Sequence, residues 1–362
     1  MFENSLMLVL VPALPLAGAL FTVLFGRLLG RHAHWPAVIS IGAAAVAAVT
    51  LLLGLGRDVL SAGAPAAGHA GAAPAVVETQ TLWRWAAVPD ASTPPAAGAV
   101  GTDLAAQAAG RPATLPLSIG IDLRLDPLTA MMLTLITCVG LLVAIYSIGY
   151  MHGDPGYPRF FALVAAFVFS MSMLVAADNF LLVYVFWEAV GACSYLLIGF
   201  WFTKPTAAAA AKKAFLVNRV GDFGLAVAVF LLWLTYGTLN FSDATLADGS
   251  LVPGILGMTR LEDASGYVGG VVGTAICLLL LVAACGKSAQ FPLHVWLPDA
   301  MEGPTPASAL IHAATMVTAG IYLIARCAPL FIGCPGALTA VSIVGATTAL
   351  SAALIATGQT DL

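Results

Sequence analysis

Long apolar stretches recur along the whole chain and are separated by short polar segments. A helix that crosses the hydrocarbon core of a bilayer needs roughly 20 predominantly apolar residues, and most of these stretches have that length. None alternates apolar and polar residues from end to end, which argues against a membrane β-barrel. The pattern predicts an all-α polytopic membrane protein with about nine transmembrane helices, at residues 5–29, 35–56, 126–150, 159–177, 179–201, 213–237, 268–298, 306–330 and 335–359.

The seventh stretch, 268–298, is too long for a simple span. As one helix it would extend about 46 Å at 1.5 Å per residue, against a hydrocarbon core of about 30 Å. Gly286, Pro292 and Pro298 offer break points, because proline removes a backbone donor and clashes with the preceding turn. We therefore expect a broken helix near 286–298, of the kind that exposes backbone groups at ion sites in transporters.

Residues 57–125 form an insertion rich in Ala, Gly and Pro, with few bulky side chains. Such a composition buries too little apolar area to order itself, so most of the insertion is expected to be flexible and external. Its end differs, because apolar and polar residues alternate over 117–125, which is the periodicity of a strand. With Leu82-Trp83-Arg84-Trp85, this segment could form a small external β-hairpin.

Composition supports a membrane protein. Of the 362 residues, 60% are hydrophobic and only 9% are charged, with a mean hydropathy of +0.97, whereas soluble domains carry about 25% charged residues. This excludes a soluble globular enzyme. The net charge is −4, so no broad basic face is available for nucleic acid.

Cofactor and disulfide signals are weak. The six cysteines have no Cys-x-x-Cys spacing, and only Cys327 and Cys334 are close enough in sequence for pairing to be considered. A metal site built from His294, His312 and Cys285 follows no ligand pattern. No phosphate-binding loop, dinucleotide fingerprint or haem-attachment motif occurs. We therefore expect no nucleotide, haem, cluster or metal in this chain.

The distribution of basic residues predicts the orientation of the helices. Cytoplasmic loops carry an excess of Lys and Arg, and alternate connections of this chain are basic. The opposite loop, 238–267, is acidic. We therefore expect the N-terminus outside, with the bilayer itself as a partner. The basic connections hold Arg27, Arg31, Arg159, Lys204, Lys212 and Lys213.

A few ionisable side chains fall inside the predicted spans, where each costs about 2.5–3.5 kcal/mol at a helix centre. Glu188 lies near the middle of the fifth span and Lys287 at the expected break, while Arg219 and Asp222 are three residues apart on one face of the sixth. A buried Glu and Lys that approach and separate can exchange protonation states, which is the chemistry of proton transfer. The alternative is a static ion pair that holds the helices together.

His312, on the eighth span, titrates near neutrality and could relay protons from Lys287. A core histidine bonded to a threonine or a backbone carbonyl is the other interpretation. Asp178, Asp299 and Glu302 fall at predicted helix ends, and we interpret them as charges at the level of the lipid headgroups.

Three segments resemble a known family: Phe-Trp-Glu-Ala-Val-Gly and the residues that follow (186–201), Asn-Arg-Val-Gly-Asp-Phe (218–223), and the long block that begins Gly-Lys-Ser-Ala-Gln-Phe-Pro (286–320). They are similar to the antiporter-like subunits of respiratory complex I, in particular subunit L and mitochondrial subunit 5. The resemblance covers about 117–362. It implies a proton-translocating membrane subunit of NADH:quinone oxidoreductase in a bacterial inner membrane.

The resemblance implies proton-transfer roles for Glu188, Lys287, Arg219, Asp222 and His312. It also implies an inverted-repeat bundle, other membrane subunits as partners, including neighbouring antiporter-like subunits, and flavin, Fe–S clusters and quinone in the partner subunits. Because the family continues beyond the position of Leu362, the chain looks truncated. The implied organisation is two leading helices (1–56), the insertion (57–125), a third helix and loop (126–158), a first five-helix repeat (159–330) and the start of a second repeat (331–362).

Two other functions remain open on the sequence. One is a subunit of a multisubunit cation/proton antiporter or of a bicarbonate-uptake system, since these share the motifs. The other is a non-conducting structural fragment, for which removal of the charges at Glu188 and Lys287 would leave pumping unaltered.

Overall fold

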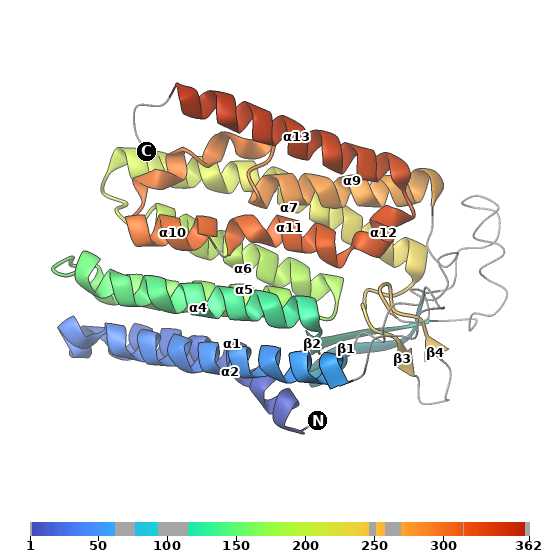
Figure 1. Cartoon of the computed structure of the whole chain (residues 1–362), viewed down its shortest axis with the longest axis horizontal. Helices are drawn as coiled ribbons and strands as arrows, with labels where there is room; N and C mark the ends of the chain where they lie inside the picture. Colours follow the sequence, from blue (N-terminus) through green and yellow to red (C-terminus); the bar gives the residue numbers. More distant parts are fainter. Residues whose placement is uncertain are drawn as a thin grey trace.

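The apolar stretches fold into long helices that lie side by side in a bundle (Figure 1), seen here in a computed structural model. The structure describes residues 2–61, 77–92, 115–245, 251–257, 269–313 and 315–358. The expectation of a flexible insertion concerns mainly residues outside these ranges. Within them, nine helical stretches are long and apolar enough to cross a membrane, which agrees with the all-α polytopic fold expected from the hydropathy pattern.

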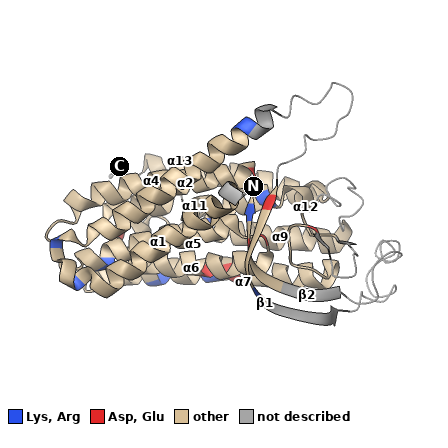
Figure 2. Cartoon of the chain, turned by 90° about the horizontal axis from the view of Figure 1, so that it is seen from below, with Lys and Arg blue, Asp and Glu red and all other residues tan. Residues whose placement is uncertain are grey.

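The elements follow the chain in an order set by the apolar stretches. The two-stranded sheets and the basic connections lie at opposite ends of the bundle (Figures 1 and 2). The elements are α1 (Phe2–Leu29), η1 (Gly30–His32), α2 (His34–Ser61), β1 (Glu78–Ser92), β2 (Leu115–Leu125), α4 (Pro127–Tyr150), α5 (Tyr157–Ala176), α6 (Phe180–Ile198), α7 (Pro205–Tyr236), β3 (Ala244–Thr245), β4 (Leu251–Val252), α9 (Gly270–Lys287), η3 (Leu293–Trp296), η4 (Asp299–Glu302), α10 (Thr305–Ala313), α11 (Met316–Arg326), α12 (Ala328–Ile332) and α13 (Pro335–Thr357).

Helix starts follow local capping rules. The Asp126 side chain accepts a hydrogen bond from the backbone N–H of Thr129 at 2.8 Å, and Pro127 occupies the first turn of α4. Asn179 caps α6 in the same way, accepting from the N–H of Leu182 at 2.7 Å. Both side chains satisfy a backbone donor that has no partner within the helix.

The segment 115–125 forms a strand in the structure. β2 pairs antiparallel with β1, with Glu78 opposite Leu125 and Val88 opposite Leu117. The hairpin is fixed to the connection between α5 and α6, because the backbone N–H of Asp178 donates to Asp122 O at 2.9 Å and Asn179 Nδ2 donates to Gly120 O at 3.0 Å. This contact closes one end of the bundle.

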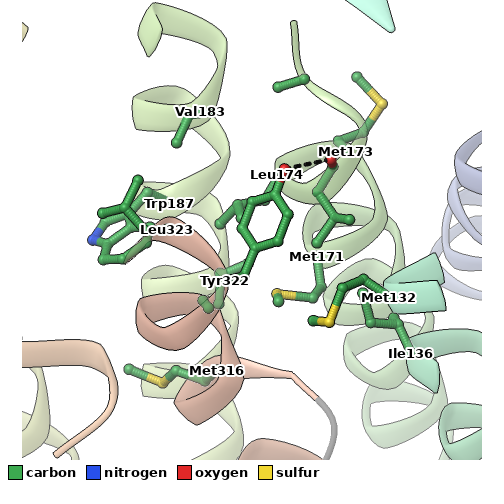
Figure 3. Close-up of a cluster of buried hydrophobic side chains, with 14 of the residues drawn as sticks. Met132, Ile136, Met171, Met173, Leu174, Val183, Trp187, Met316, Tyr322 and Leu323 are labelled. Carbon is green, nitrogen blue, oxygen red and sulfur yellow. Dashed lines mark hydrogen bonds between the residues drawn. The ribbon is translucent and has the colours of Figure 1, made fainter. Parts of the chain in front are cut away.

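The core of the bundle lies where α4, α5, α6 and α11 meet (Figure 3). Methionine and branched aliphatic side chains surround Tyr322 there, and its hydroxyl donates to Val175 O at 2.7 Å. A buried hydroxyl needs such a partner, because an unpaired polar group is costly away from water. Trp187 lies at the edge of this cluster beside Leu323, and it joins the core to the polar site described below.

The seventh apolar stretch breaks as expected, since α9 ends at Lys287 and the chain continues through η3 and η4. The eighth differs from expectation, because 306–330 is not one helix but α10, α11 and part of α12. Hydroxyl side chains donate hydrogen bonds to backbone carbonyl groups at this second interruption. Carbonyl groups freed by a break inside a membrane need such partners. Ser288 Oγ donates to Val317 O at 2.6 Å and Thr318 Oγ1 to Thr315 O at 2.8 Å.

Candidate functional site: a charged chain across three helices

Four charged side chains form a continuous chain in the middle of the bundle. Glu188 lies in α6, Arg219 and Asp222 in α7, and Lys287 is the last residue of α9. Arg219 Nη1 contacts a carboxylate oxygen of Glu188 and lies 3.9 Å from Asp222 Oδ2. Lys287 Nζ lies 3.5 Å from Asp222 Oδ1. The structure thus places Arg219 and Asp222 between the Glu and the Lys, which are not paired directly.

Two glycines allow α7 and α9 to approach closely. A Cβ atom at Gly221 would lie 3.1 Å from Gly286 Cα and 3.3 Å from Ala283 O. Small residues at a helix crossing let the two backbones meet. Because Asp222 follows Gly221 and Lys287 follows Gly286, this crossing brings the carboxylate and the ammonium group together.

Lys287 is completely buried and occupies a niche built by α6. An added Cβ atom at Gly191 would lie 2.7 Å from Lys287 Nζ, so the absence of a side chain there makes room for the ammonium group. Nζ also lies 5.8 Å from the ring centroid of Trp187, which is within the range of a cation–π contact. Its position at the end of α9 places the charge at the negative end of the helix dipole.

Trp187 also belongs to this candidate site, which the sequence did not predict. Its Nε1 donates a 2.8 Å hydrogen bond to Asp222 Oδ1, the oxygen that faces Lys287. Gly191 lies four residues further along α6, hence on the same side of the helix as Trp187. A tryptophan in an apolar helix gives no sign of this contact, because the contact depends on how α6 packs against α7.

Exposure falls along the charged chain. The side chains of Arg219 and Glu188 are 41% and 20% exposed, against 4% for Asp222 and 1% for Lys287. The Arg219 guanidinium carbon lies 4.4 Å from the ring centroid of Phe215, so its stem is covered by an aromatic side chain. The charged chain therefore leads from the outer face of the bundle to its interior.

His312 lies in α10, on the other side of the helix break. Its Nε2 is buried and has no hydrogen-bond partner among the described residues. Its ring stacks near Trp296, with centroids 6.4 Å apart, and Trp296 Nε1 donates to Gly286 O at 3.0 Å. Trp296 therefore lies between His312 and the residue preceding Lys287.

A second polar network lies at the end of the bundle that carries the strands. Asp126 binds Arg326, with Nη2 3.1 Å from Oδ1, and Arg124, with Nε 3.0 Å from Oδ2. Burial would raise the pKa of Asp126, but Arg326 and Arg124 outweigh it and hold the pKa well below its usual range. This network could not be predicted from the sequence, because it joins β2, the start of α4 and the end of α11.

The interpretation of Asp178 as a charge at the headgroup level is wrong, since the side chain is buried in this second network. It accepts from Ser242 Oγ at 2.8 Å and lies 3.5 Å from Arg124 Nη1. Burial raises the pKa of Asp178 to about 6, although Arg124 and Ser242 oppose the shift. Asp299 and Glu302 do lie at the surface, bonded to Lys213 at 2.7 Å and Thr206 at 2.9 Å.

The described residues contain no group of three or more His, Cys, Asp or Glu side chains that could hold a metal ion. All six cysteines are free thiols, so Cys327 and Cys334 are not paired. The arrangement offers ion pairs and titratable groups.

The fold and the charged chain define a polytopic, antiporter-like membrane protein. Residues 177–362, more than half of the chain, match the family described as NADH:quinone oxidoreductase/Mrp antiporter, TM, and residues 113–161 match the N-terminal part of chain 5 of complex I, NADH-ubiquinone oxidoreductase. The chain belongs to the NADH:quinone oxidoreductase/Mrp antiporter transmembrane family.

Relatives of known name agree with this assignment. The chain is 52% identical over 239 residues to the chloroplastic NAD(P)H-quinone oxidoreductase subunit 5 of Poa pratensis, covering 66% of this chain and 32% of the relative. The corresponding protein of Zygnema circumcarinatum is 50% identical over 246 residues, covering 68% and 34%. The chain thus spans about a third of the length of these relatives.

A solved structure shares the fold. The structure of the Mrp complex from Dietzia sp. DQ12-45-1b matches 88% of this chain and 27% of its own matched chain, with a TM-score of 0.60 and 27% sequence identity. The antiporter-like fold is therefore common to this chain and to a chain of an Mrp complex.

Proposed function

We propose that this chain is a proton-translocating membrane subunit of an NADH:quinone oxidoreductase of the complex I type, coupled to quinone reduction elsewhere in the assembly. The observation that carries the proposal is the charged chain, which runs from the half-exposed Arg219 to the fully buried Lys287 at a helix break. Ionisable groups at membrane depth are expensive, and they mark ion pathways and proton relays. The support from relatives is their printed name, NAD(P)H-quinone oxidoreductase subunit 5.

Arg219 can switch the charged chain between two states, one in which it pairs with Glu188 and one in which it pairs with Asp222. Its Nη1 contacts Glu188 and lies within 4 Å of Asp222, so a small movement exchanges one carboxylate for the other. When Arg219 pairs with Asp222, the carboxylate attracts Lys287 less strongly, and an unpaired ammonium group in an apolar site gives up its proton. When Arg219 returns to Glu188, Lys287 Nζ takes up a proton and pairs with Asp222 again.

A proton released by Lys287 would next pass to His312. The open Nε2 of His312 supports this step, since it has no partner among the described residues and can accept a proton. Trp296 lies between His312 and Gly286, so the proton would pass the indole ring on its way from Lys287. Water molecules would carry it over this distance. In this proposal Glu188, Arg219, Asp222, Lys287 and His312 all act in proton transfer.

The wider assignment follows from the same proposal. Residues 159–330 would form a first five-helix repeat and 331–362 the start of a second. The partners are other membrane subunits, including neighbouring antiporter-like subunits, while flavin, Fe–S clusters and quinone belong to partner subunits. We also propose a bacterial inner membrane with the N-terminus outside, on the support of the basic connections at one end of the bundle (Figure 2); the plant relatives named above are chloroplastic.

The test is NADH-driven proton uptake by sealed vesicles that contain the assembled complex. Lys287→Met and Glu188→Gln should each abolish most of the proton uptake assigned to this subunit, because each removes one end of the charged chain. Lys213→Met is the matched control, since Lys213 is an exposed lysine paired with Asp299 at the end of the bundle. Wild-type pumping by both site variants would refute the proposal and favour a static ion pair.

A cation/proton antiporter subunit is the second candidate, favoured by the structural match to an Mrp complex. Native mass spectrometry of the solubilised assembly separates the two. Co-purifying subunits that carry flavin and Fe–S clusters would establish the oxidoreductase. Small antiporter subunits without redox proteins, together with sodium/proton exchange in vesicles, would establish the antiporter.

A further inference from the structure

A cavity of about 510 Å³ lies at the basic end of the bundle, far from the charged chain. Its walls come from the end of α1 with η1 and from the connection between α4 and α5. The residues that matter for its chemistry are Arg27, Arg31, Gly30, His152 and Tyr157. Figure 2 shows Lys and Arg gathered at this end of the molecule.

The cavity carries more positive than negative charge, because two arginines and one carboxylate, that of Asp154, line it. Arg27 lies in the last turn of α1 and Arg31 in η1; both line the cavity and both are exposed. Neither guanidinium group forms an ion pair or a hydrogen bond with any described residue. Asp154 also lines the cavity, but its oxygens are engaged by Gly156 N at 2.6 Å and Trp201 Nε1 at 3.0 Å.

The backbone keeps the cavity open. Gly30 has a φ of +51°, a conformation that other residues rarely adopt, and an added Cβ atom there would meet nothing within 4 Å. One turn earlier, a Cβ atom at Gly26 would lie 2.8 Å from Pro158 Cβ, so α1 and α5 touch at that point. The cavity is thus a gap that begins where two tightly packed helices diverge.

An exposed apolar strip runs along α1, the helix whose last turn lines the cavity. Leu20, Leu24 and Leu28 are spaced four residues apart along α1, and their exposed fractions are 54%, 70% and 84%. A free anion would gain nothing from these leucines, whereas an acyl chain would cover them. Trp35, also exposed at the start of α2, is a residue typical of the membrane–water interface.

We propose that this cavity is a binding site for an anionic phospholipid. Arg27 and Arg31 hold the phosphodiester oxygens by charge-assisted hydrogen bonds, and an acyl chain lies along Leu20, Leu24 and Leu28. Basic pockets between transmembrane helices on the cytoplasmic side are suited to such headgroups. The site is independent of the proposed proton path.

The test is lipid retention by the full chain in detergent, read by native mass spectrometry after addition of dioleoyl-phosphatidylglycerol or the zwitterionic dioleoyl-phosphatidylcholine. The wild type should retain the anionic lipid in preference to the zwitterionic one. Arg27→Gln/Arg31→Gln should weaken retention of the anionic lipid by about 30-fold, given the usual contribution of one basic side chain at a membrane surface. Arg57→Gln is the matched control, because Arg57 is an exposed arginine near the opposite end of α2.

Two further arms separate the lipid from other occupants. Inorganic phosphate in large excess should not displace the lipid, and displacement by phosphate alone would overturn the assignment in favour of a free anion. Arg27→Lys/Arg31→Lys should retain most of the binding, which shows that loss in the Gln variant reflects charge and not misfolding. Retention of the anionic lipid by the Gln variant at the wild-type level would also overturn the proposal.

Discussion

Trp187 Nε1 donates a 2.8 Å hydrogen bond to Asp222 Oδ1. The same oxygen faces Lys287 Nζ at 3.5 Å, so one carboxylate oxygen is shared between an indole of the hydrophobic core and the buried lysine. This relationship links the packing of α6 to the position of the charge on α7.

Trp187→Phe should preserve the fold and slow proton transfer. The phenyl ring keeps most of the apolar contacts of the indole (Figure 3), but Asp222 loses its neutral donor. A hydrogen bond to a charged group is worth about 1.5–3 kcal/mol, which corresponds to roughly tenfold or more in rate if the bond orients the carboxylate during transfer. Proton uptake by vesicles measures this.

Trp201→Phe is the matched control for that substitution. Trp201 Nε1 also donates to an aspartate, Asp154 Oδ2 at 3.0 Å, but at the end of the bundle. It should leave the rate of proton uptake unchanged. Equal loss of uptake in both variants would show that the effect of Trp187→Phe is structural.

Gly191→Ala should disturb Lys287 without unfolding the protein. The new methyl carbon would lie 2.7 Å from Lys287 Nζ, so the ammonium group must move away from its place beside Asp222. The stability cost is small, because the displaced atom is the end of a flexible side chain and alanine is favoured over glycine in helices by up to about 1 kcal/mol. We expect a several-fold loss of proton uptake with an almost unchanged Tm.

Gly42→Ala is the control for steric effects. A methyl group there would lie 3.5 Å from Leu141 Cδ1, an ordinary contact. It should change neither Tm nor proton uptake. Wild-type uptake in Gly191→Ala would mean that the exact place of the ammonium group is unimportant.

The sequence predicts most of the bundle and all four members of the charged chain, and what it does not predict has a physical cause. The helices could be located because each must be about 20 apolar residues long, and Glu188 and Lys287 stand out because charge is rare in such stretches. The break after Gly286 was visible in its prolines. The interruption near Thr315 was not, because 307–328 contains no proline and its carbonyl groups are satisfied partly by Ser288 from another helix.

Contacts between distant elements account for the other misses. The role of Trp187 depends on the crossing of α6 and α7, and that of Gly191 on the depth of Lys287. The error at Asp178 has the same origin. A charge at the end of an apolar stretch is typical of an interfacial residue. Asp178 is instead buried against Ser242 and Arg124, which are more than 50 residues away in the sequence.

Asp126→Asn should strongly destabilise the protein. The amide retains an oxygen for the cap of α4, but Arg326 and Arg124 lose their negative partner while remaining buried. Removal of one partner from a buried ion pair costs about 3–5 kcal/mol. The chain in detergent should therefore show a clearly lower Tm at neutral pH.

The exposed pair of Lys213 and Asp299 provides the comparison for this loss. Surface ion pairs contribute about 0–1 kcal/mol, so Asp299→Asn should hardly change Tm. Because the pKa of Asp126 is lowered in the folded state, its contribution is present above the ordinary pKa of the carboxyl and is lost as the pH falls toward the folded value. A Tm of Asp126→Asn equal to that of the wild type would contradict the proposed importance of the network.

Asp178 should make stability fall as the pH rises from about 4 to about 6. Burial raises the pKa of Asp178 from 3.8 to about 6, so the folded protein binds this proton more tightly than the unfolded chain does. As the pH rises between these two values, the free energy of unfolding therefore decreases by about 3 kcal/mol in total. Above them, the contribution of Asp178 is constant. Asp178→Asn removes the titration, so the Tm of the wild type relative to this variant should fall across that interval, whereas Asp299→Asn should follow the wild type. A constant difference between wild type and Asp178→Asn would show that the buried carboxyl does not titrate there.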